Sequence, residues 1–166
     1  MKKIKNPLVF IVQDSTVYKS MLVGYLQQKK IKNIKTFSSP EECMKALHHK
    51  PDIIVLNHFF ESITGSELML KIKQEHPEID FIFLSGQNDV EVAVNIMKQG
   101  AADYIMKNEK APENLVRSIE HLIAATRRQK VRRGFKIGVI GFFILLFLVI
   151  MAIILLTIFL EDFKFS

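Results

Sequence analysis

Five polar side chains stand where the apolar runs of this chain end. They are Gln13 and Asp14 after "LVFIV", Asn57 at the end of "DIIVLN", Ser85 after "DFIFL", and Lys107 after "DYIM". Only Asp14 carries a carboxylate, whereas a hard divalent cation prefers several charged oxygens. The amide of Asn57 is a poor nucleophile, because its nitrogen lone pair is delocalised. These residue types predict a polar cluster with a structural role, with weak affinity for metal and no covalent chemistry at Asn57.

The apolar runs before these side chains are typical of short β-strands. Strands are expected at residues 8–12, 31–37, 52–56, 80–84 and 103–106. Helical patterns separate them, which indicates five βα units and a parallel sheet covered on both faces. The first, third and fourth strands are apolar throughout and should be central, whereas the second alternates and should lie at an edge. This pattern favours a doubly wound α/β fold with the flavodoxin-like strand order 2-1-3-4-5, in which the carboxyl ends of the first and third strands form the site.

Several helix starts can be read from the sequence. Ser39 and Thr64 are each followed three residues later by a glutamate, which is the pattern of the capping box. Pro40 and Pro112 are expected at the first position of their helices, where proline is favoured.

A long uncharged run lies near the end of the chain. It covers residues 137–160 and contains 24 consecutive residues without a charge. At ~1.5 Å per helical residue it would extend roughly 36 Å, which exceeds the hydrocarbon thickness of about 30 Å. The sequence therefore predicts one transmembrane helix, in contact with the lipid bilayer.

The charges before this run predict its orientation. Basic residues exceed acidic ones by six over the whole chain. Six basic residues directly precede the run: Arg127, Arg128, Lys130, Arg132, Arg133 and Lys136. Basic flanks stay on the cytoplasmic side. We therefore expect a single-pass protein of a bacterial inner membrane, with the N-terminal domain in the cytoplasm and residues 161–166 beyond the bilayer.

The order and spacing of the polar positions resemble those of the response-regulator receiver domain, over residues 7 to about 125. In that family an acidic pair follows the first strand, a phosphoacceptor Asp ends the third, a Ser or Thr ends the fourth, and a Lys ends the fifth. The segments at those places are "FIVQDS", "IIVLNHF", "FIFLSG" and "GAADYIMK". The resemblance implies a role in two-component, phosphorelay signalling. It also implies that Tyr104 is the aromatic that changes rotamer on activation and that Gly65 opens the third helix.

The chain departs from the family where the family's chemistry occurs. Asn57 replaces the phosphoacceptor, so no acyl phosphate is expected. Gln13 replaces the first acid of the pair, so Mg²⁺ should bind weakly. Asn108 and Glu61 stand where the family usually has proline.

The remaining residues of this degenerate phosphoacceptor pocket suggest a structural role. We expect Lys107 to pair with Asp14 and to donate to the amide oxygen of Asn57, with Ser85 nearby. Such a network ties three strands together and avoids crowding like charges.

The segment at residues 89–100, "DVEVAVNIMKQG", is apolar around more than one helical face. We predict that Val92 and Met97 lie at a surface that binds a protein partner. The resemblance implies that helix 4, strand 5 and helix 5 form the dimer and output face, so a second copy of the chain is one candidate partner. Nucleic acid is not an expected partner, because a basic helix at the bilayer has little room to dock DNA and no separate output domain is expected.

The domain organisation that follows has four parts. A receiver-like domain is expected at residues 1–126, a basic juxtamembrane helix at 127–136, the transmembrane helix at 137–160 and a short tail at 161–166. We expect a membrane-anchored pseudo-receiver: a protein-interaction or scaffold module that is independent of phosphorylation, is not an enzyme, and holds no cofactor or metal.

Two alternatives remain open. The chain could be a conventional phosphorylatable receiver whose acceptor Asp has been substituted by Asn. Gln13 argues against this, because a single change would have left the acidic pair intact. The chain could also be a structural subunit of a larger membrane machine.

Overall fold

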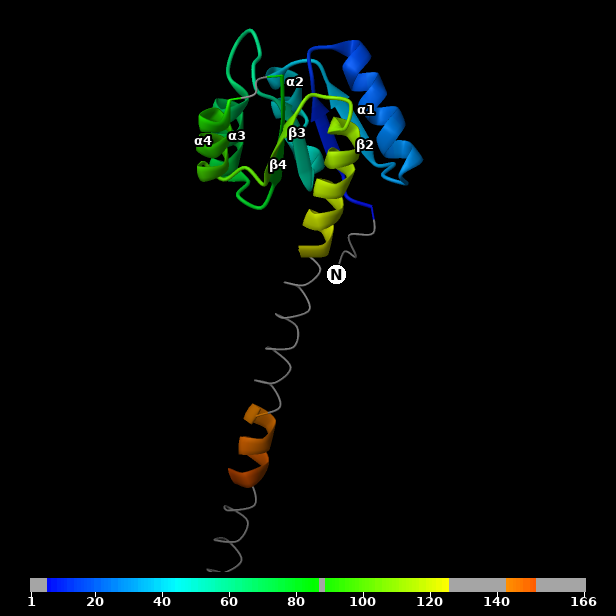
Figure 1. Cartoon of the computed structure of the whole chain (residues 1–166). Helices are drawn as coiled ribbons and strands as arrows, with labels where there is room; N and C mark the ends of the chain where they lie inside the picture. The colour runs from blue at the N-terminus through cyan, green and yellow to red at the C-terminus, as the bar shows by residue number, and fades with distance from the viewer. Residues whose placement is uncertain (1–5, 87–88, 126–142, 152–166) are drawn as a thin grey trace, which may run out of the picture. The chain divides into compact units, whose positions relative to one another are not determined.

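The computed structural model in Figure 1 describes residues 6–86, 89–125 and 143–151. The chain divides into two compact units, residues 1–124 and 125–166. The first unit contains a five-stranded parallel sheet with the order β2-β1-β3-β4-β5. Its strands are β1 (Val9–Val12), β2 (Ile34–Phe37), β3 (Ile53–Asn57), β4 (Asp80–Ser85) and β5 (Asp103–Met106). The predicted strand order and parallel direction are confirmed.

Helices cover both faces of this sheet (Figure 1). They are α1 (Thr16–Gln28), α2 (Pro40–Lys45), α3 (Gly65–Glu75), α4 (Val90–Lys98) and an unlabelled helix at residues 111–125, with a short 3-10 helix η1 (Leu47–His49). Successive strand residues point to opposite faces, so each strand contributes to two cores. On one face α1 and helix 111–125 pack on residues such as Val9 and Val55, and on the other α2, α3 and α4 pack on residues such as Phe10 and Leu56.

The second strand is shorter than predicted, because its first expected residues close the preceding helix. The backbone N–H of Ile31 donates to the carbonyl oxygen of Leu26 at 3.0 Å, and the Ile31 side chain is buried in the core of α1. The ladder with β1 therefore begins only at Ile34, which pairs with Val9.

One predicted capping box is confirmed and the other is half formed. Thr64 and Glu67 satisfy each other's backbone N–H at the start of α3. At α2, the Ser39 hydroxyl accepts from the N–H of Glu42, but the Glu42 carboxylate accepts from the N–H of Ser38 at 2.8 Å. The glutamate therefore binds one residue earlier than the capping box requires.

Within the second unit the structure describes a helix at residues 143–151, whose large apolar side chains are exposed. Among the described residues, no helix is long and apolar enough to cross a membrane. The remainder of the predicted span at 137–160 and the tail at 161–166 lie outside the described residues. The same applies to the six basic residues predicted to precede the span, Arg127, Arg128, Lys130, Arg132, Arg133 and Lys136.

Candidate functional site

The side chain of Asn57 is the centre of the polar cluster at the carboxyl ends of the strands. Its Nδ2 donates to Asp14 Oδ1 at 3.1 Å and to the carbonyl oxygen of Phe59 at 2.8 Å. Its Oδ1 accepts from Lys107 Nζ at 3.1 Å and from the backbone N–H of His58 at 3.0 Å. An amide has two donor hydrogens and two acceptor lone pairs. All four positions of Asn57 are therefore in use.

The hydrogen-bonding groups of its partners match an amide at this position. Asp14 offers only acceptors toward Asn57, and Lys107 offers only donors. A carboxylate in place of Asn57 would satisfy Lys107 but would face Asp14 across about 3.1 Å with two acceptors and two negative charges. The Asn57 amide thus bridges the Asp14 carboxylate and the Lys107 ammonium group, which make no direct contact.

Lys107 differs from its predicted arrangement. Its Nζ donates to Gln13 Oε1 and to Asn57 Oδ1, each at 3.1 Å, and lies 4.9 Å from the centroid of the Tyr18 ring. The expected direct pairing with Asp14 is wrong, because the Asn57 amide lies between the two charges. Burial lowers the pKa of Lys107 below its ordinary value, and the nearby charge of Asp14 opposes that shift.

Gln13 and Tyr18 complete the surroundings of the ammonium group. The Gln13 side chain is fully buried, and among the described residues its Nε2 has no hydrogen-bond partner. Tyr18 was not predicted from the sequence, although it stands one helical turn after Asp14 and so projects from the same end of α1. The side-chain oxygens of Gln13 and Asn57 and the face of the Tyr18 ring thus surround the three donor hydrogens of the Lys107 ammonium group.

The ends of three strands position these groups. The backbone N–H of Lys107 donates to the carbonyl oxygen of Ser85 at 2.7 Å, which fixes the end of β5 beside buried Ser85. Gly65 lies close to the end of β3: a Cβ added there would be 2.3 Å from the carbonyl oxygen of Asn57. Only glycine permits this approach of the loop to the strand.

The charges of the cluster balance without a cation. Asp14 carries one negative charge and Lys107 one positive charge, while Gln13, Asn57 and Ser85 are neutral. Within residues 6–86, 89–125 and 143–151, no group of three or more His, Cys, Asp or Glu side chains is arranged to hold a metal ion. The arrangement can hold strands together, and position 57 presents an amide in place of a carboxylate nucleophile.

His58 lies next to this cluster in an apolar environment. Its side chain is 7% exposed, and its ring packs against Phe59 at 4.1 Å and Phe83 at 6.3 Å between centroids. Its Nδ1 is buried and has no hydrogen-bond partner in the described part of the chain. Burial therefore lowers the pKa of His58.

We expect acidification to destabilise the fold through His58. A base whose folded pKa is depressed binds fewer protons when folded, so its contribution to stability is complete above the unfolded pKa of about 6.5 and is lost as pH falls below it. Urea unfolding at about pH 7.5 and about pH 5.5 should show a larger loss of unfolding free energy for the wild type than for His58→Phe. An equal loss in both would contradict a neutral, buried His58.

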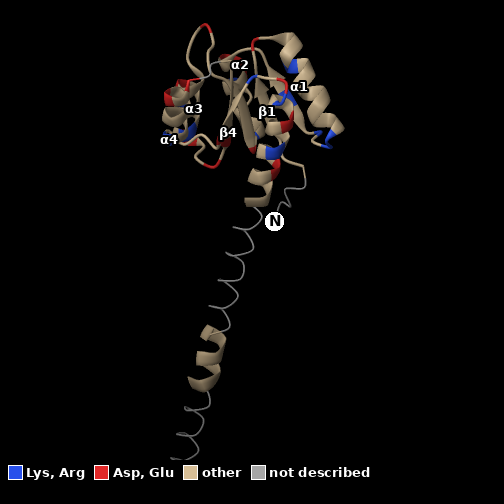
Figure 2. Ribbon diagram, in the orientation of Figure 1, with Lys and Arg blue, Asp and Glu red and all other residues tan. Residues whose placement is uncertain are grey.

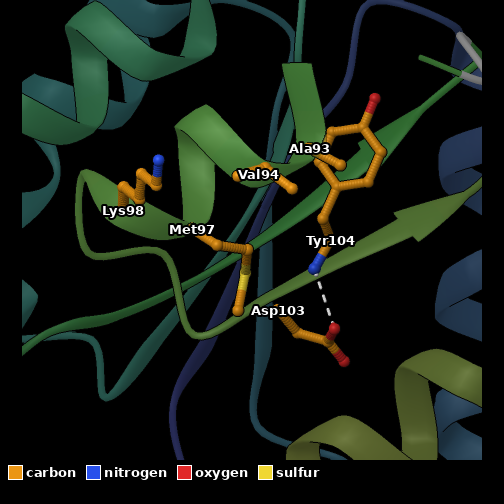
Figure 3. Close-up of a pocket in the computed structure, with 6 residues that line it drawn as sticks. All are labelled: Ala93, Val94, Met97, Lys98, Asp103 and Tyr104. Atoms are coloured by element: carbon orange, nitrogen blue, oxygen red, sulfur yellow. Dashed lines mark hydrogen bonds between the residues drawn. The ribbon is translucent and has the colours of Figure 1, made fainter. Parts of the chain in front are cut away.

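A groove of about 500 Å³ lies between α4 and β5 (Figure 3), and no residue of the polar cluster lines it. It is lined by Ala93, Val94, Met97, Lys98, Asp103 and Tyr104. Figure 3 shows the Tyr104 ring beside Ala93, and the backbone N–H of Tyr104 donates to Asp103 Oδ1 at 2.8 Å. Apolar side chains make up most of the groove's lining, which also includes one charge of each sign, Lys98 and Asp103.

The two residues predicted for this surface have different environments. Met97 is exposed and lines the groove, whereas Val92 is partly buried against the core beneath α4. The helical period explains the difference, because Val92 shares its face with buried Ile96. Val94 occupies the exposed position that was predicted for Val92.

Comparison with known proteins gives a consistent result. Residues 9–120 match the response regulator receiver domain. The chain is 33% identical over 91 residues to the uncharacterised transcriptional regulatory protein YesN of Bacillus subtilis, covering 54% of this chain and 24% of YesN. It is 28% identical over 136 residues to the DNA-binding transcriptional regulator NtrC of Salmonella typhimurium, covering 81% of this chain and 29% of NtrC.

A solved structure shows the same fold. It is the crystal structure of the signal receiver domain of a protein described as a LuxO repressor from Vibrio parahaemolyticus, with a TM-score of 0.69 and 20% identity. The match covers 76% of this chain and 96% of that domain. By contrast, this chain spans less than a third of the length of YesN and of NtrC.

Proposed function

Because this chain belongs to the response regulator receiver domain family through residues 9–120, we propose that it is a signalling receiver which acts without being phosphorylated. The main support for this proposal is the side chain of Asn57. It stands where the family's phosphoacceptor is expected, and it uses all four hydrogen-bonding positions of its amide. An amide oxygen cannot form the acyl phosphate, and the groups around Asn57 are matched to an amide. The domain is then an interaction module and not an enzyme.

The charge balance supports independence from metal as well. Three carboxylates beside one lysine would carry a net charge of −2, which a divalent cation neutralises. Here Asp14 and Lys107 already cancel, so a bound Mg²⁺ would add uncompensated positive charge. Gln13 also gives its amide oxygen to Lys107, so that oxygen is not available to a cation.

A second part of the proposal is that the chain is anchored in the cytoplasmic membrane by residues 137–160. The support is the 24-residue uncharged run in the sequence and the six basic residues before it. The described portion at 143–151 is helical and exposes apolar side chains around its circumference, including Phe143, Leu145 and Phe147, each more than half exposed. Such a helix is stable in lipid and unfavourable in water.

We predict that the full chain remains with the membrane after washing with alkaline carbonate and is released only by detergent. In sealed inside-out vesicles, added protease should digest the N-terminal domain while a tag after Ser166 stays protected. This follows because basic flanks stay in the cytoplasm. Release by carbonate would contradict the anchor, and digestion of the tag with protection of the domain would contradict the orientation.

The groove between α4 and β5 is the surface that we assign to protein binding. Val94 and Met97 are 46% and 43% exposed on it, and Lys98 and Asp103 give it both signs of charge. A second copy of the chain would meet this face with opposite charges on an apolar patch. Self-association through the groove is therefore the partner mode that we propose.

Aspartate at both Val94 and Met97 should reduce self-association by at least tenfold, because each charge would be buried without a partner in the interface. Val17→Asp is the matched control, since Val17 is 83% exposed on α1, outside the groove. Association of the full chain in detergent can be measured by light scattering, with and without acetyl phosphate. Association that survives the double substitution, or that requires acetyl phosphate, would refute this part of the proposal.

A conventional phosphorylatable receiver whose acceptor Asp has been substituted by Asn is the second candidate. The observation in its favour is that Lys107, Ser85 and Asp14 keep the family's residue types. The buried amide of Gln13, which is committed to Lys107, is the observation against it.

A further inference from the structure

Three residues that follow helices in the described chain adopt the left-handed backbone conformation, and two of them are lysines. Gly100 follows α4 with a φ of 101°, whereas Lys30 follows α1 with a φ of 68° and Lys50 follows η1 with a φ of 56°. Glycine adopts this conformation without steric cost, but the Cβ of any other L-residue is crowded there. Lysine is thus present at two sites where glycine would relieve strain.

The backbone pattern at these helix ends accepts either residue. The N–H of Lys30 donates to the carbonyl oxygen of Gln27 at 3.0 Å, and the N–H of Gly100 donates to that of Met97 at the same distance. Both are the hydrogen bond by which a left-handed residue closes a helix. The side chain of Lys30 therefore has no evident role in forming the turn, which points to a role for its charge.

Lysines gather at this end of the domain. We call Lys29, Lys30, Lys32 and Lys50 the basic edge; all four are exposed. Three lie just before β2 and the fourth just before β3. Because Ile34 of β2 and Ile53 of β3 both pair with Val9, the two strand starts lie roughly 10 Å apart. Figure 2 shows basic residues at the end of α1, which leads into β2.

The segments that carry the basic edge contain no acidic residue, whereas Asp52, Asp80 and Asp103 stand at or beside the starts of β3, β4 and β5. The sequence has no acidic residue at 27–40 or at 43–51. The carboxylate of Asp52, which follows, accepts from the backbone N–H of Leu8 at 2.8 Å. The side chains of His48 and His49 in η1 carry no negative charge in either protonation state, so η1 adds no counter-charge.

The basic edge lies where the chain leaves the domain. Helix 111–125 begins after β5 and runs antiparallel to the strands, so it ends at the same edge of the sheet as the starts of β2 and β3 (Figure 1). In the sequence it is followed by the six basic residues and the uncharged run. In the sequence, the chain therefore continues from this edge of the domain into the run for which we propose a membrane anchor.

We propose that the basic edge binds the headgroups of anionic phospholipids, so that the receiver rests on the membrane by a fixed face. This inference rests on the membrane anchor proposed above. Each lysine near an anionic bilayer contributes attraction, which falls off within a Debye length. The opposite edge, which carries Asn57 and Asp14, would then face the cytoplasm.

The test uses the full chain reconstituted in vesicles of phosphatidylcholine, with or without phosphatidylglycerol. Rates of reductive methylation of individual lysines can be read by peptide mass spectrometry. We expect phosphatidylglycerol to slow the modification of Lys30, Lys32 and Lys50 by about fivefold or more, reversed by high salt. Lys110, exposed at the opposite edge, is the internal control and should be unaffected.

Two variants separate charge from backbone strain. Lys30→Gly with Lys50→Gly should keep or raise the melting temperature, because the strain is relieved, yet protection of Lys32 should fall by about fivefold or more. Lys30→Arg with Lys50→Arg should retain protection. A variant that loses both stability and protection would show that these lysines are structural, and would overturn the proposal.

The outcomes distinguish this inference from the anchor itself. Chain that carbonate removes from the vesicles would overturn the anchor, and the inference with it. Chain that stays inserted but shows equal lysine rates in both lipids would leave the anchor standing and overturn the binding of anionic headgroups.

Discussion

Replacing Lys107 with methionine should lower the free energy of unfolding by about 2–4 kcal/mol. The substitution removes the hydrogen bond that the fully buried Gln13 amide oxygen accepts from Lys107, and it takes one of the two donors that the structure describes at Asn57 Oδ1. A buried polar group that loses its partner bears its full desolvation cost, and hydrogen bonds to charged groups are the stronger ones. Urea unfolding of the full chain in detergent, followed by circular dichroism, measures the loss.

A second substitution tests whether Gln13 is the affected partner. In the wild type, Gln13→Leu should destabilise, because it leaves the Lys107 ammonium with fewer acceptors. In the Lys107→Met background the same change should stabilise, because it removes the unpaired amide and fills its space. This reversal of sign is a coupling between the two sites. Additive effects would show that the hydrogen bond at 3.1 Å contributes little.

Restoring both missing carboxylates should create a strong dependence on Mg²⁺. In Gln13→Asp with Asn57→Asp, three carboxylates face one lysine, so the apo domain should be less stable than the wild type. Mg²⁺ at about a hundred times its dissociation constant would raise the free energy of unfolding by about 2.7 kcal/mol. The midpoint of thermal unfolding, recorded with and without Mg²⁺, measures this effect, and the wild type should show no such increase.

The single substitution Asn57→Asp is the matched control. The new carboxylate would pair with the Lys107 ammonium group, but it would also face the Asp14 carboxylate at about 3.1 Å, with an acceptor on each side. Gln13 still occupies a position that the metal requires, so we expect a destabilised domain with weak response to Mg²⁺ and no efficient phosphorylation. Phosphorylation of this variant at the rate of ordinary receivers would mean that the effect of Gln13 has been overestimated.

The sheet could be predicted from the sequence because each strand is short, apolar and bounded by turn residues. Strand order followed from which strands alternate and which do not, as β2 shows. Element ends were less certain: Ile31 fits a strand pattern, but its side chain is buried under α1 and its N–H closes that helix. Local propensity alone does not indicate which of two neighbouring elements will use such a residue.

The members of the polar cluster were also predictable, since parallel strands bring their carboxyl ends together. The pairing among them was not, because it depends on ångström-scale geometry. Lys107 reaches Gln13 and Asn57, and the amide of Asn57 separates it from Asp14. The Tyr18 ring over Lys107 was missed, although its spacing from Asp14 was a usable signal.

The exposed face of α4 could also be predicted only in part from the sequence. An apolar excess in the segment was visible in the sequence, but the choice of outward residues required the phase of the helix. Ile96 is buried in the core, and Val92 packs on the core from the same helical face. Val94 and Met97 lie on the exposed side of the helix.

The most direct test of the central claim is the intact mass of the wild-type chain after incubation with acetyl phosphate and Mg²⁺. The variant with both carboxylates restored serves as the positive control for the donor. We predict that the wild type keeps its unmodified mass while that variant gains one phosphoryl group. A stoichiometric phosphoryl adduct on the wild-type chain would contradict the account, because it would show that this pocket, with an amide at Asn57, still accepts phosphate.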